Sequence, residues 1–428
     1  MGKKYYLHSL GCKVNSYETA ALGTELSREG WTRVSSFSDA DLIILNTCSV
    51  TGRADQKSRQ HISSFRKGNS CAIIVAMGCY TQNHAEQAAS LGANIVLGAA
   101  DRALVLKYIE EFKRDGKTII DIKKNIRHES YEEFGETAFC DNVRAYLKVQ
   151  DGCDNFCSYC FIPFLRGNSR SREPRNVVRE AQMLCEKGYP EIVITGIHIG
   201  GYGKDLADGA YRLSALLENI LLKCPTLTRL RVSSIEESEI DDKFLDLLRR
   251  FPTIADHLHI PLQSGSANVL KAMKRKYDTK AFLDKLQAIR AVRPDIAITT
   301  DVIAGFPGET EEEWRETMEF CAQAAFAEIH VFPFSPRPGT YAARLKDTDA
   351  AVKKARVHEL LALSKKMRSE YEARFYGKKM PVLFEQYDAQ KHCAYGHSSN
   401  YLLVAIPAEK PLDGTIEEIT YNSSVASD

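Results

Sequence analysis

The stretch RAYLKVQDGCDNFCSYC, residues 144–160, joins a β-strand pattern directly to three closely spaced cysteines. Cys153, Cys157 and Cys160 have the spacing C-x3-C-x2-C, which brings three thiolates together on one loop. Thiolates at this density suit a cubane iron–sulfur cluster, and three cysteines for four irons leave one iron without a protein ligand. We therefore predict a cluster with one iron open to another molecule.

A structural zinc site is the alternative interpretation of these cysteines. Such a site normally has a fourth Cys or His close by, and the upstream candidates His128 and Cys140 are poorly spaced for that role. The spacing therefore favours the cluster.

The residues that follow continue the same β-then-α pattern. Strand patterns alternate with helical ones, and six such units are fewer than the eight of a closed barrel, which predicts an open partial (β/α)6 barrel. The predicted strands are RAYLKVQ at 144–150, EIVITG at 191–196, RLRVSSI at 229–235, HLHIPLQ at 257–263, AITTDVI at 297–303 and EIHVFPF at 328–334.

The chain before and after this series differs from it. Residues 1–116 alternate strand and helix patterns and predict a parallel α/β domain, and a charged stretch at 113–136 is typical of a connector. The barrel series is expected over residues 138–370, ending in a long helix near 350–375. Residues 371–428 contain PVLFEQY, YLLVAIP and GTIEEITY, which predict a small all-β module.

Three other cysteines each follow a predicted strand of the first domain. Cys12 lies in LGCKVN, Cys48 in NTCSVT and Cys79 in GCYTQ. Since the carboxyl ends of parallel strands share one edge of a sheet, these cysteines can meet despite their separation in sequence. They predict a second cluster, and the alternative is that they are small buried apolar residues. That alternative suits Cys71, Cys185, Cys224 and Cys321, whereas Cys140 and Cys393 receive no metal role.

Composition sets the remaining limits. A chain of 428 residues with 44% apolar residues predicts two or three globular domains. No apolar run is long enough for a membrane span, and the start MGKKYYLHSLGCK lacks the pattern of a signal peptide, so we expect a cytoplasmic protein without a membrane partner. Twelve cysteines in a reducing compartment favour metal ligation over disulfides.

Taken together, the motifs resemble the methylthiotransferase branch of the radical S-adenosylmethionine superfamily. LGCKVN, NTCSVT, GCY, the central cysteines, LQSGS, TTDVIAGFPGET and FPFSPRPGT occur in the order typical of that family. Within it, SLGCKVNSYE and NTCSVTGRADQKSRQ resemble the tRNA N6-threonylcarbamoyladenosine methylthiotransferases.

The resemblance implies two [4Fe-4S] clusters, S-adenosylmethionine and transfer of a methylthio group to carbon-2 of the modified adenosine next to the anticodon. Cys153, Cys157 and Cys160 would hold the radical-forming cluster, and Cys12, Cys48 and Cys79 the auxiliary one. It also implies a TRAM-like carboxyl-terminal module and an electron donor such as flavodoxin or ferredoxin. The expected S-adenosylmethionine contacts are Tyr159, Gly196, Ser234, Gln263 and Asp301.

These five contacts also have simpler explanations. Tyr159 can be an ordinary core aromatic residue, and Gly196 an ordinary turn glycine. Ser234, Gln263 and Asp301 are proposed because they lie at or just past predicted strands, where barrel sites are built.

The net charge of +1 says little about RNA, but the charge is unevenly distributed. Three windows are basic, with five Lys or Arg and one acid each, 5 − 1 = +4: residues 53–67, 166–179 and 271–280. They predict phosphate contacts with the anticodon arm of tRNA. The alternative is that these windows are solvated helix faces. Residues 371–428 contain five bases and eight acids, 5 − 8 = −3, so the module either reads RNA shape or mainly supports the fold.

Three rival functions remain open at this stage. Methylthiolation of isopentenyladenosine in tRNA or of a ribosomal protein would use the same chemistry on another substrate. A non-enzymatic, metal-stabilised RNA-binding protein would use the cysteines only for structure.

Overall fold

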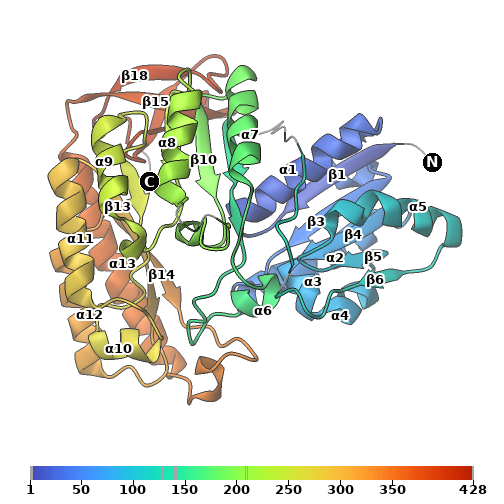
Figure 1. The fold of residues 1–428 in the computed structure, drawn as a ribbon, viewed down its shortest axis with the longest axis horizontal. Helices are drawn as coiled ribbons and strands as arrows, with labels where there is room; N and C mark the ends of the chain where they lie inside the picture. The colour runs from blue at the N-terminus through green and yellow to red at the C-terminus, as the bar shows by residue number, and fades with distance from the viewer. Residues whose placement is uncertain are drawn as a thin grey trace.

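The computed structural model describes residues 3–127, 129–135, 137, 143–207, 209 and 211–426. His128 and Cys140, the two candidates for a fourth zinc ligand, lie outside the described residues. In Figure 1 the amino-terminal α/β unit lies on the right, the barrel on the left and the carboxyl-terminal strands at the top of the barrel.

The amino-terminal unit is a six-stranded parallel sheet in the order β2-β1-β3-β4-β5-β6. Its strands are β1 Lys4–Ser9, β2 Thr32–Arg33, β3 Leu42–Thr47, β4 Ile73–Gly78, β5 Ile95–Leu97 and β6 Ile119–Asp121. Its helices are α1 Lys13–Arg28, α2 Gly52–Gly68, α3 Cys79–Asn83, α4 Ala85–Ser90 and α5 Val105–Asp115.

The two faces of this sheet are covered by different helices. Leu22 of α1 and Ile109 of α5 pack on one face, whereas Phe65 of α2 and Ala88 of α4 pack on the other. Because β3 and β4 are therefore buried on both faces, they are apolar along most of their length, as central parallel strands usually are.

The barrel consists of two parallel three-stranded sheets, β11-β10-β7 and β12-β13-β14. Isolated bridges from Leu230 to Ile254 and from Ser234 to His259 join them into one curved wall. The strands are β7 Arg144–Lys148, β10 Glu191–Thr195, β11 Arg229–Val232, β12 His257–His259, β13 Ala297–Ala304 and β14 Glu328–Pro333. The helices are α6 Ile162–Arg166, α7 Pro174–Glu186, α8 Leu213–Lys223, α9 Asp242–Arg250, α10 Ala267–Ala272, α11 Thr279–Val292, α12 Glu311–Ala324 and α13 Ala350–Ala373. A short antiparallel pair, β8 Gln150–Asp151 and β9 Arg170–Ser171, adjoins β7.

Alternation along the barrel strands separates apolar from polar side chains. Leu147, Ile194 and Leu258 belong to the large core that also contains side chains of the outer helices. Residues one position away, such as Lys148 and His259, therefore face the inner side of the wall. A polar inner wall leaves space for a polar ligand and not for a packed core.

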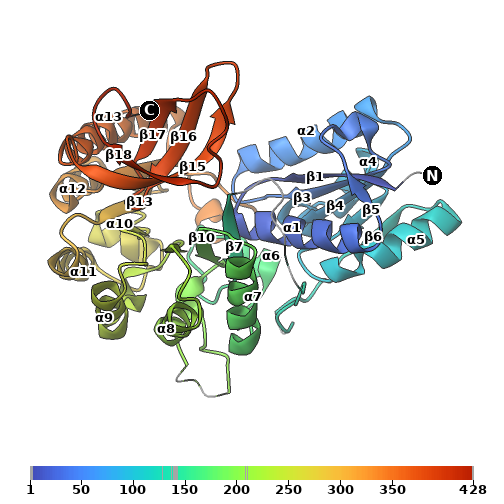
Figure 2. The ribbon, with the colours of Figure 1, turned by 90° about the horizontal axis from the view of Figure 1, so that it is seen from above.

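The amino-terminal unit lies against the open side of this wall. Helix α1 packs on β7, and both views show it between the first sheet and the barrel (Figures 1 and 2). The Tyr17 hydroxyl of α1 donates a hydrogen bond of 3.0 Å to Glu180 of α7.

The carboxyl-terminal module is an antiparallel sheet in the order β17-β16-β15-β18, and Figure 2 shows it beside the barrel and α13. The strands are β15 Lys379–Asp388, β16 Cys393–Ser398, β17 Leu403–Pro407 and β18 Ile416–Thr420. The module contacts the amino-terminal ends of barrel strands: Arg229 donates to the carbonyl oxygens of Pro381 and His397, and the guanidinium of Arg231 lies 4.7 Å from the ring centre of Tyr401. It therefore closes the end of the barrel opposite to the cysteine loop.

Most of the predicted architecture is confirmed, with four short strands added. The stretch expected to be only a connector contains β6, which extends the first sheet to Asp121. Strands β2, β9 and β16 were also not predicted. The division of the chain into three domains, with boundaries at residues 116, 138 and 370, stays a prediction. Among the described residues, no helix combines the length and the apolar character that a membrane span requires.

Candidate functional site

The three dispersed cysteines meet at the carboxyl edge of the first sheet. Cys12 directly precedes α1, Cys48 follows β3 directly, and Cys79 begins α3 directly after β4. Thr47 and Gly78, the residues before Cys48 and Cys79, are register partners on adjacent strands. The strand register therefore places these two cysteines side by side.

Close backbone packing brings Cys12 to the same place. A Cβ atom on Gly11 would lie 2.6 Å from the Sγ atom of Cys48, and Gly11 has a φ of +91° that favours glycine. The side-chain amide of Asn15 donates to the carbonyl oxygens of Leu10 at 2.8 Å and Thr47 at 3.0 Å, which ties the Cys12 loop to β3. We call Cys12, Cys48 and Cys79 the auxiliary triad.

A buried guanidinium lies against this triad. The Nε atom of Arg166, at the end of α6, donates to the Sγ atom of Cys79 at 3.3 Å, and its Nη1 and Nη2 atoms donate to Glu18 at 2.8 Å and Asn15 at 2.6 Å. Arg166 is fully buried, as is Glu18. An N–H group aimed at a sulfur stabilises negative charge on a thiolate or on a cluster.

Arg166 belongs to a larger network of buried charges between the two units. Burial opposes ionisation of Glu18, but the cations around it hold the pKa of its carboxyl well below the usual range. In the described part of the chain, this network contains four cationic side chains and three carboxylates. Its net charge beside the triad is therefore 4 − 3 = +1. The network comprises Arg102, Lys148, Arg166 and Arg170 with Glu18, Asp151 and Glu132.

The other three cysteines lie on the loop between β8 and α6 at the open end of the barrel. The Cys153 amide donates to the carbonyl oxygen of Gly167 at 3.0 Å, and the Cys160 amide to that of Cys157 at 3.0 Å. The Ser158 hydroxyl and amide donate to the carbonyl oxygens of Ala272 and Met273, which fasten the loop to the end of α10. We call Cys153, Cys157 and Cys160 the central triad.

Two cationic side chains contact the central triad. Arg275 donates from Nη1 to the Sγ atom of Cys157 at 3.3 Å and from Nη2 to Glu236 at 2.8 Å. His198 lies 2.7 Å from Glu239. Burial opposes its charge, yet hydrogen bonds with Cys153 and Glu239 raise the pKa of His198 to about 10.

The thiols suit metal ligation better than free nucleophilic chemistry. Burial raises the pKa of Cys48 to about 12 and that of Cys160 to about 12, so the free thiols stay protonated near neutral pH. A metal displaces such protons when it binds. Each triad offers three thiolate donors and at least one N–H donor to sulfur, which fits a [4Fe-4S] cluster with one open iron.

Comparison with known proteins identifies the group to which the chain belongs. Residues 147–321 match the radical SAM superfamily, and residues 4–98 match the uncharacterized protein family UPF0004. The chain is 42% identical, over 96% of its own length and 92% of the relative's, to the threonylcarbamoyladenosine tRNA methylthiotransferase MtaB of Bacillus subtilis. The chain belongs to this methylthiotransferase family.

Other relatives come from two branches of the family, and the identity is higher for the threonylcarbamoyladenosine branch. The threonylcarbamoyladenosine tRNA methylthiotransferase MtaB of Thermotoga maritima is 36% identical over 94% of this chain and 90% of that protein. The tRNA-2-methylthio-N(6)-dimethylallyladenosine synthase of Bacillus anthracis is 30% identical over 98% of this chain and 83% of that protein. The resemblance found in the sequence, with its two [4Fe-4S] clusters and S-adenosylmethionine, is confirmed at the level of the family.

Solved structures support the fold. The radical S-adenosylmethionine methyltransferase TsrM of Kitasatospora setae, described with cobalamin and a [4Fe-4S] cluster bound, has a TM-score of 0.59 at 16% identity, over 80% of this chain and 74% of that one. The cobalamin-dependent S-adenosylmethionine radical enzyme OxsB has a TM-score of 0.53 at 13% identity, over 86% of this chain and 56% of that one.

The five S-adenosylmethionine contacts expected from the sequence lie on separate elements of the barrel. Gly196 follows β10, where a Cβ atom would lie 3.0 Å from the carbonyl oxygen of Gln150. Tyr159 packs against the small apolar cluster that contains Phe306 and Phe334. Ser234 is exposed just past β11. These roles stay predictions.

Gln263 and Asp301 adjoin each other at the carboxyl side of β12 and β13. The main-chain N–H of Gln263 donates a hydrogen bond of 2.8 Å to the main-chain carbonyl oxygen of Asp301. The Asp301 carboxylate lies 3.2 Å from His259, whose ring stacks on that of His330 at 5.4 Å. Both residues therefore lie on the inner wall with polar neighbours that the sequence analysis did not single out.

The prediction for the second basic window, 166–179, is wrong for most of its arginines. Arg166, Arg170 and Arg172 are at most 5% exposed and hold buried carboxylates, so they are not available to phosphates. Arg275 in the third window is likewise buried against Glu236. The sequence shows these residues only as positive charges, because their partners are far away along the chain.

The remaining cysteines are mostly structural. Cys224 and Cys321 are buried as expected, and Cys185 is half-buried. Cys71 is exposed, contrary to expectation, because it lies in the turn before β4 and not in the strand.

Proposed function

We propose that each triad holds one [4Fe-4S] cluster and that the protein methylthiolates carbon-2 of N6-threonylcarbamoyladenosine next to the anticodon of tRNA. The observation that carries this proposal is the presence of two cysteine triads at neighbouring sheet edges, linked by the short segment from Cys160 to Arg166. The names of the most similar relatives support the substrate.

The chemistry requires more than the side chains can offer. Carbon-2 of adenine carries an unactivated C–H bond, which neither a general base nor a nucleophile can functionalise. When bound, the cluster at the central triad would supply a 5′-deoxyadenosyl radical from S-adenosylmethionine, and the cluster at the auxiliary triad would carry the sulfur that is methylated and transferred.

The chain's own residues prepare this site. Arg166 and Arg275 each direct an N–H group at a ligand sulfur and thereby stabilise its negative charge. The carboxyl-terminal module is fastened to the far end of the barrel by Arg229 and Arg231, which donate to the carbonyl oxygens of Pro381 and Ser399. The polar inner wall, with His259 and Asp301, then has the character needed to bind a nucleoside.

One assay separates the two triads. A Cys48→Ala variant should still cleave S-adenosylmethionine to 5′-deoxyadenosine, but it should give no methylthiolated tRNA, a loss of at least about a hundredfold. A Cys157→Ala variant should give neither product. The substrate is tRNA that carries N6-threonylcarbamoyladenosine, with unmodified and isopentenylated tRNA as controls, and mass spectrometry of nucleosides is the readout.

The outcomes of this assay are distinct. Full product from Cys48→Ala would remove the auxiliary role from that triad. Product only on the isopentenylated tRNA would move the protein to the sister branch. No 5′-deoxyadenosine from the wild type would leave only a metal-stabilised RNA-binding protein.

For the tRNA itself, the best docking surface is helix α2. Arg53, Lys57 and Lys67 are exposed on it, and its one acid, Asp55, is buried and paired with Arg337 at 2.8 Å. The helix begins four residues after Cys48 and runs outward for about 25 Å. We propose that this face follows the phosphates of the anticodon arm.

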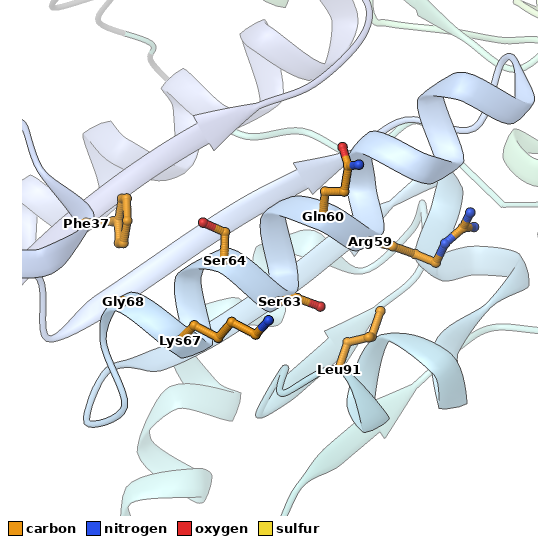
Figure 3. Close-up of a pocket in the computed structure, with 8 residues that line it drawn as sticks. All are labelled: Phe37, Arg59, Gln60, Ser63, Ser64, Lys67, Gly68 and Leu91. Carbon is orange, nitrogen blue, oxygen red and sulfur yellow. The ribbon is translucent and has the colours of Figure 1, made fainter.

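A hollow of about 670 Å³ lies beside the far end of α2. Figure 3 shows Arg59, Ser63 and Lys67 projecting from the helix, with Leu91 on the facing segment. None of the residues that line it is acidic: Phe37, Arg59, Gln60, Ser63, Ser64, Lys67, Gly68 and Leu91. Such a surface suits a phosphate backbone.

Salt dependence tests this surface. Replacing Arg53, Lys57 and Lys67 by Gln should weaken tRNA binding and lower the slope of log Kd against log salt by about 2–3. Lys243→Gln is the control, because Lys243 is an exposed lysine on α9, which Figure 1 shows in the barrel at the other side of the molecule from α2. An unchanged slope in the triple variant would mean that the basic side chains of α2 are only solvated and do not contact phosphates.

A cytoplasmic location of the protein stays a prediction.

A further inference from the structure

A second, smaller hollow lies beside the central triad. It has a volume of about 210 Å³, and Cys157 and Cys160 are among its walls. None of the residues of the barrel strands and none of the five expected S-adenosylmethionine contacts lines it. The full lining is Phe156, Cys157, Ser158, Cys160, Phe164, Lys274, Gly339, Thr340, Tyr341 and Arg344.

Aromatic side chains surround this hollow without being buried. Phe156, Phe164 and Tyr341 are 39%, 43% and 54% exposed, and the rings of Phe156 and Phe164 meet edge to face at 6.0 Å. Three large exposed rings around one depression mark an interaction surface more than ordinary surface apolarity does. Their position over two cysteines of the triad connects that surface to the cluster site.

The backbone holds two of the lining residues in an unusual conformation. Phe156 has a φ of +47° and Lys274 a φ of +58°. Such angles are costly for residues with bulky side chains and persist where the surrounding structure enforces them, often at functional sites. Here they belong to a bulky aromatic residue and a lysine on the same hollow.

The charge of this surface is positive. Lys274 and Arg344 line the hollow, no lining residue is acidic, and the Lys274 ammonium lies 5.4 Å from the ring centre of Tyr341. Lys271 and Lys276 are exposed in the same segment. The aromatic centre of this surface suits an apolar contact, such as the exposed edge of a flavin ring. Its basic side chains complement acidic residues around that contact on a partner protein.

We propose that this surface docks a small acidic electron-transfer protein that delivers single electrons to the central triad's cluster. The inference rests on the proposed function, because only a cluster at Cys157 and Cys160 gives the surface an electron acceptor. In each event the donor, a flavin or [2Fe-2S] protein, loses one electron and the cluster gains it, and no atom is transferred to the chain.

RNA is the competing occupant, since exposed aromatic rings with lysines also stack bases. The hollow favours the donor because it is small and ends at two of the cluster ligands, whereas the nucleoside has the polar inner wall of the barrel. Binding of the tRNA is therefore measured in the same experiment.

The test uses the cluster-loaded enzyme and a purified bacterial flavodoxin as the probe. Lys274→Glu with Arg344→Glu should weaken flavodoxin binding, measured by calorimetry at several salt concentrations, by about tenfold or more. Without tRNA, the rate of 5′-deoxyadenosine formation driven by flavodoxin should fall by a similar factor, whereas the rate driven by dithionite should stay within about twofold. Tyr341→Ala, which changes no charge, should also weaken flavodoxin binding.

The matched control is Lys223→Glu with Lys243→Glu, which reverses two exposed charges on α8 and α9. Unchanged flavodoxin binding in the Lys274 and Arg344 variant would overturn the proposal. If this variant instead bound tRNA more weakly, the surface would be a contact site for RNA. An equal loss with dithionite would also overturn it, because the two side chains would then act on the cluster site itself. Failure of the wild type to methylthiolate tRNA, with flavodoxin binding intact, would count against the proposed function alone.

Discussion

The auxiliary and central triads offer similar ligands but are built in different ways. Three cysteines within eight residues form the central triad on one loop, whereas the auxiliary triad collects Cys12, Cys48 and Cys79 from three strand ends. The first needs only local chain geometry. The second exists only when the sheet has formed, because the register of β3 with β4 places Cys48 beside Cys79.

Their surroundings differ as well. The auxiliary triad lies beside a dense network in which Arg166 and Glu18 are both fully buried. At the central triad, Arg275 is paired with Glu236, which is 15% exposed. The auxiliary triad therefore depends on the interface between the two units, whereas the central triad depends mainly on its own barrel.

The largest expected effect concerns iron. Anaerobic reconstitution of the wild type should give about eight irons per chain, and replacing Cys153, Cys157 and Cys160 together by Ala should leave about four. Replacing Cys12, Cys48 and Cys79 should also leave about four, with the spectroscopic signal of the other cluster. Iron analysis with electron paramagnetic resonance measures both.

The control for this experiment is Cys71→Ala, at an exposed cysteine with no proposed ligand role, which should keep all the iron. Zinc as the main metal, or about four irons in the wild type, would contradict the existence of two clusters.

The sequence predicts most of the fold because its strands are strongly apolar or clearly periodic. β3 and β4 are buried along their whole length and were therefore easy to recognise. β2 has two residues, β6 has three, and β16 contains Gly396 and several polar residues. These strands depend on pairing with a neighbour, which no local pattern records.

The same limit applies to the site. The spacing of the central cysteines is a local signal, and the strand ends point to the auxiliary ones. Arg166 and Arg275 carried no such signal, since a buried arginine and a surface arginine look alike in a sequence. Glu18 lies 148 residues before Arg166, so only the folded structure reveals that they form a pair.

The second prediction tests how far the auxiliary triad depends on buried charge. Glu18→Gln leaves the surrounding cations without their shared carboxylate and should lower the free energy of unfolding at pH 7 by about 3–5 kcal/mol. Glu236→Gln at the central triad should cost less, about 1–3 kcal/mol. Urea unfolding of the cluster-free protein measures both.

The pH dependence of this loss follows from the pKa of Glu18. The folded protein holds this pKa below its ordinary value of 4.5, so the carboxylate's contribution is complete above pH 4.5 and is lost as the pH falls toward the folded pKa. The difference between the wild type and Glu18→Gln should therefore be constant between pH 6 and pH 8 and shrink below about pH 4.5. A difference that persists unchanged at pH 3 would show that Glu18 acts through packing and not through its charge.

The smallest expected effect is on the reduction potentials, and it separates the two triads without any substrate. Arg166→Lys keeps a positive charge but removes the Nε–H donor to Cys79, and Arg275→Lys removes the Nη1–H donor to Cys157. A reduced cluster carries one more negative charge, which an N–H group at a ligand sulfur stabilises, so loss of that group should lower the potential by tens of millivolts. Redox titration followed by electron paramagnetic resonance should show a shift of the auxiliary cluster alone in Arg166→Lys and of the central cluster alone in Arg275→Lys. If either variant shifted both clusters equally, the two guanidinium groups would be acting through the overall charge of the interface, and the pairing of one arginine with each triad would be wrong.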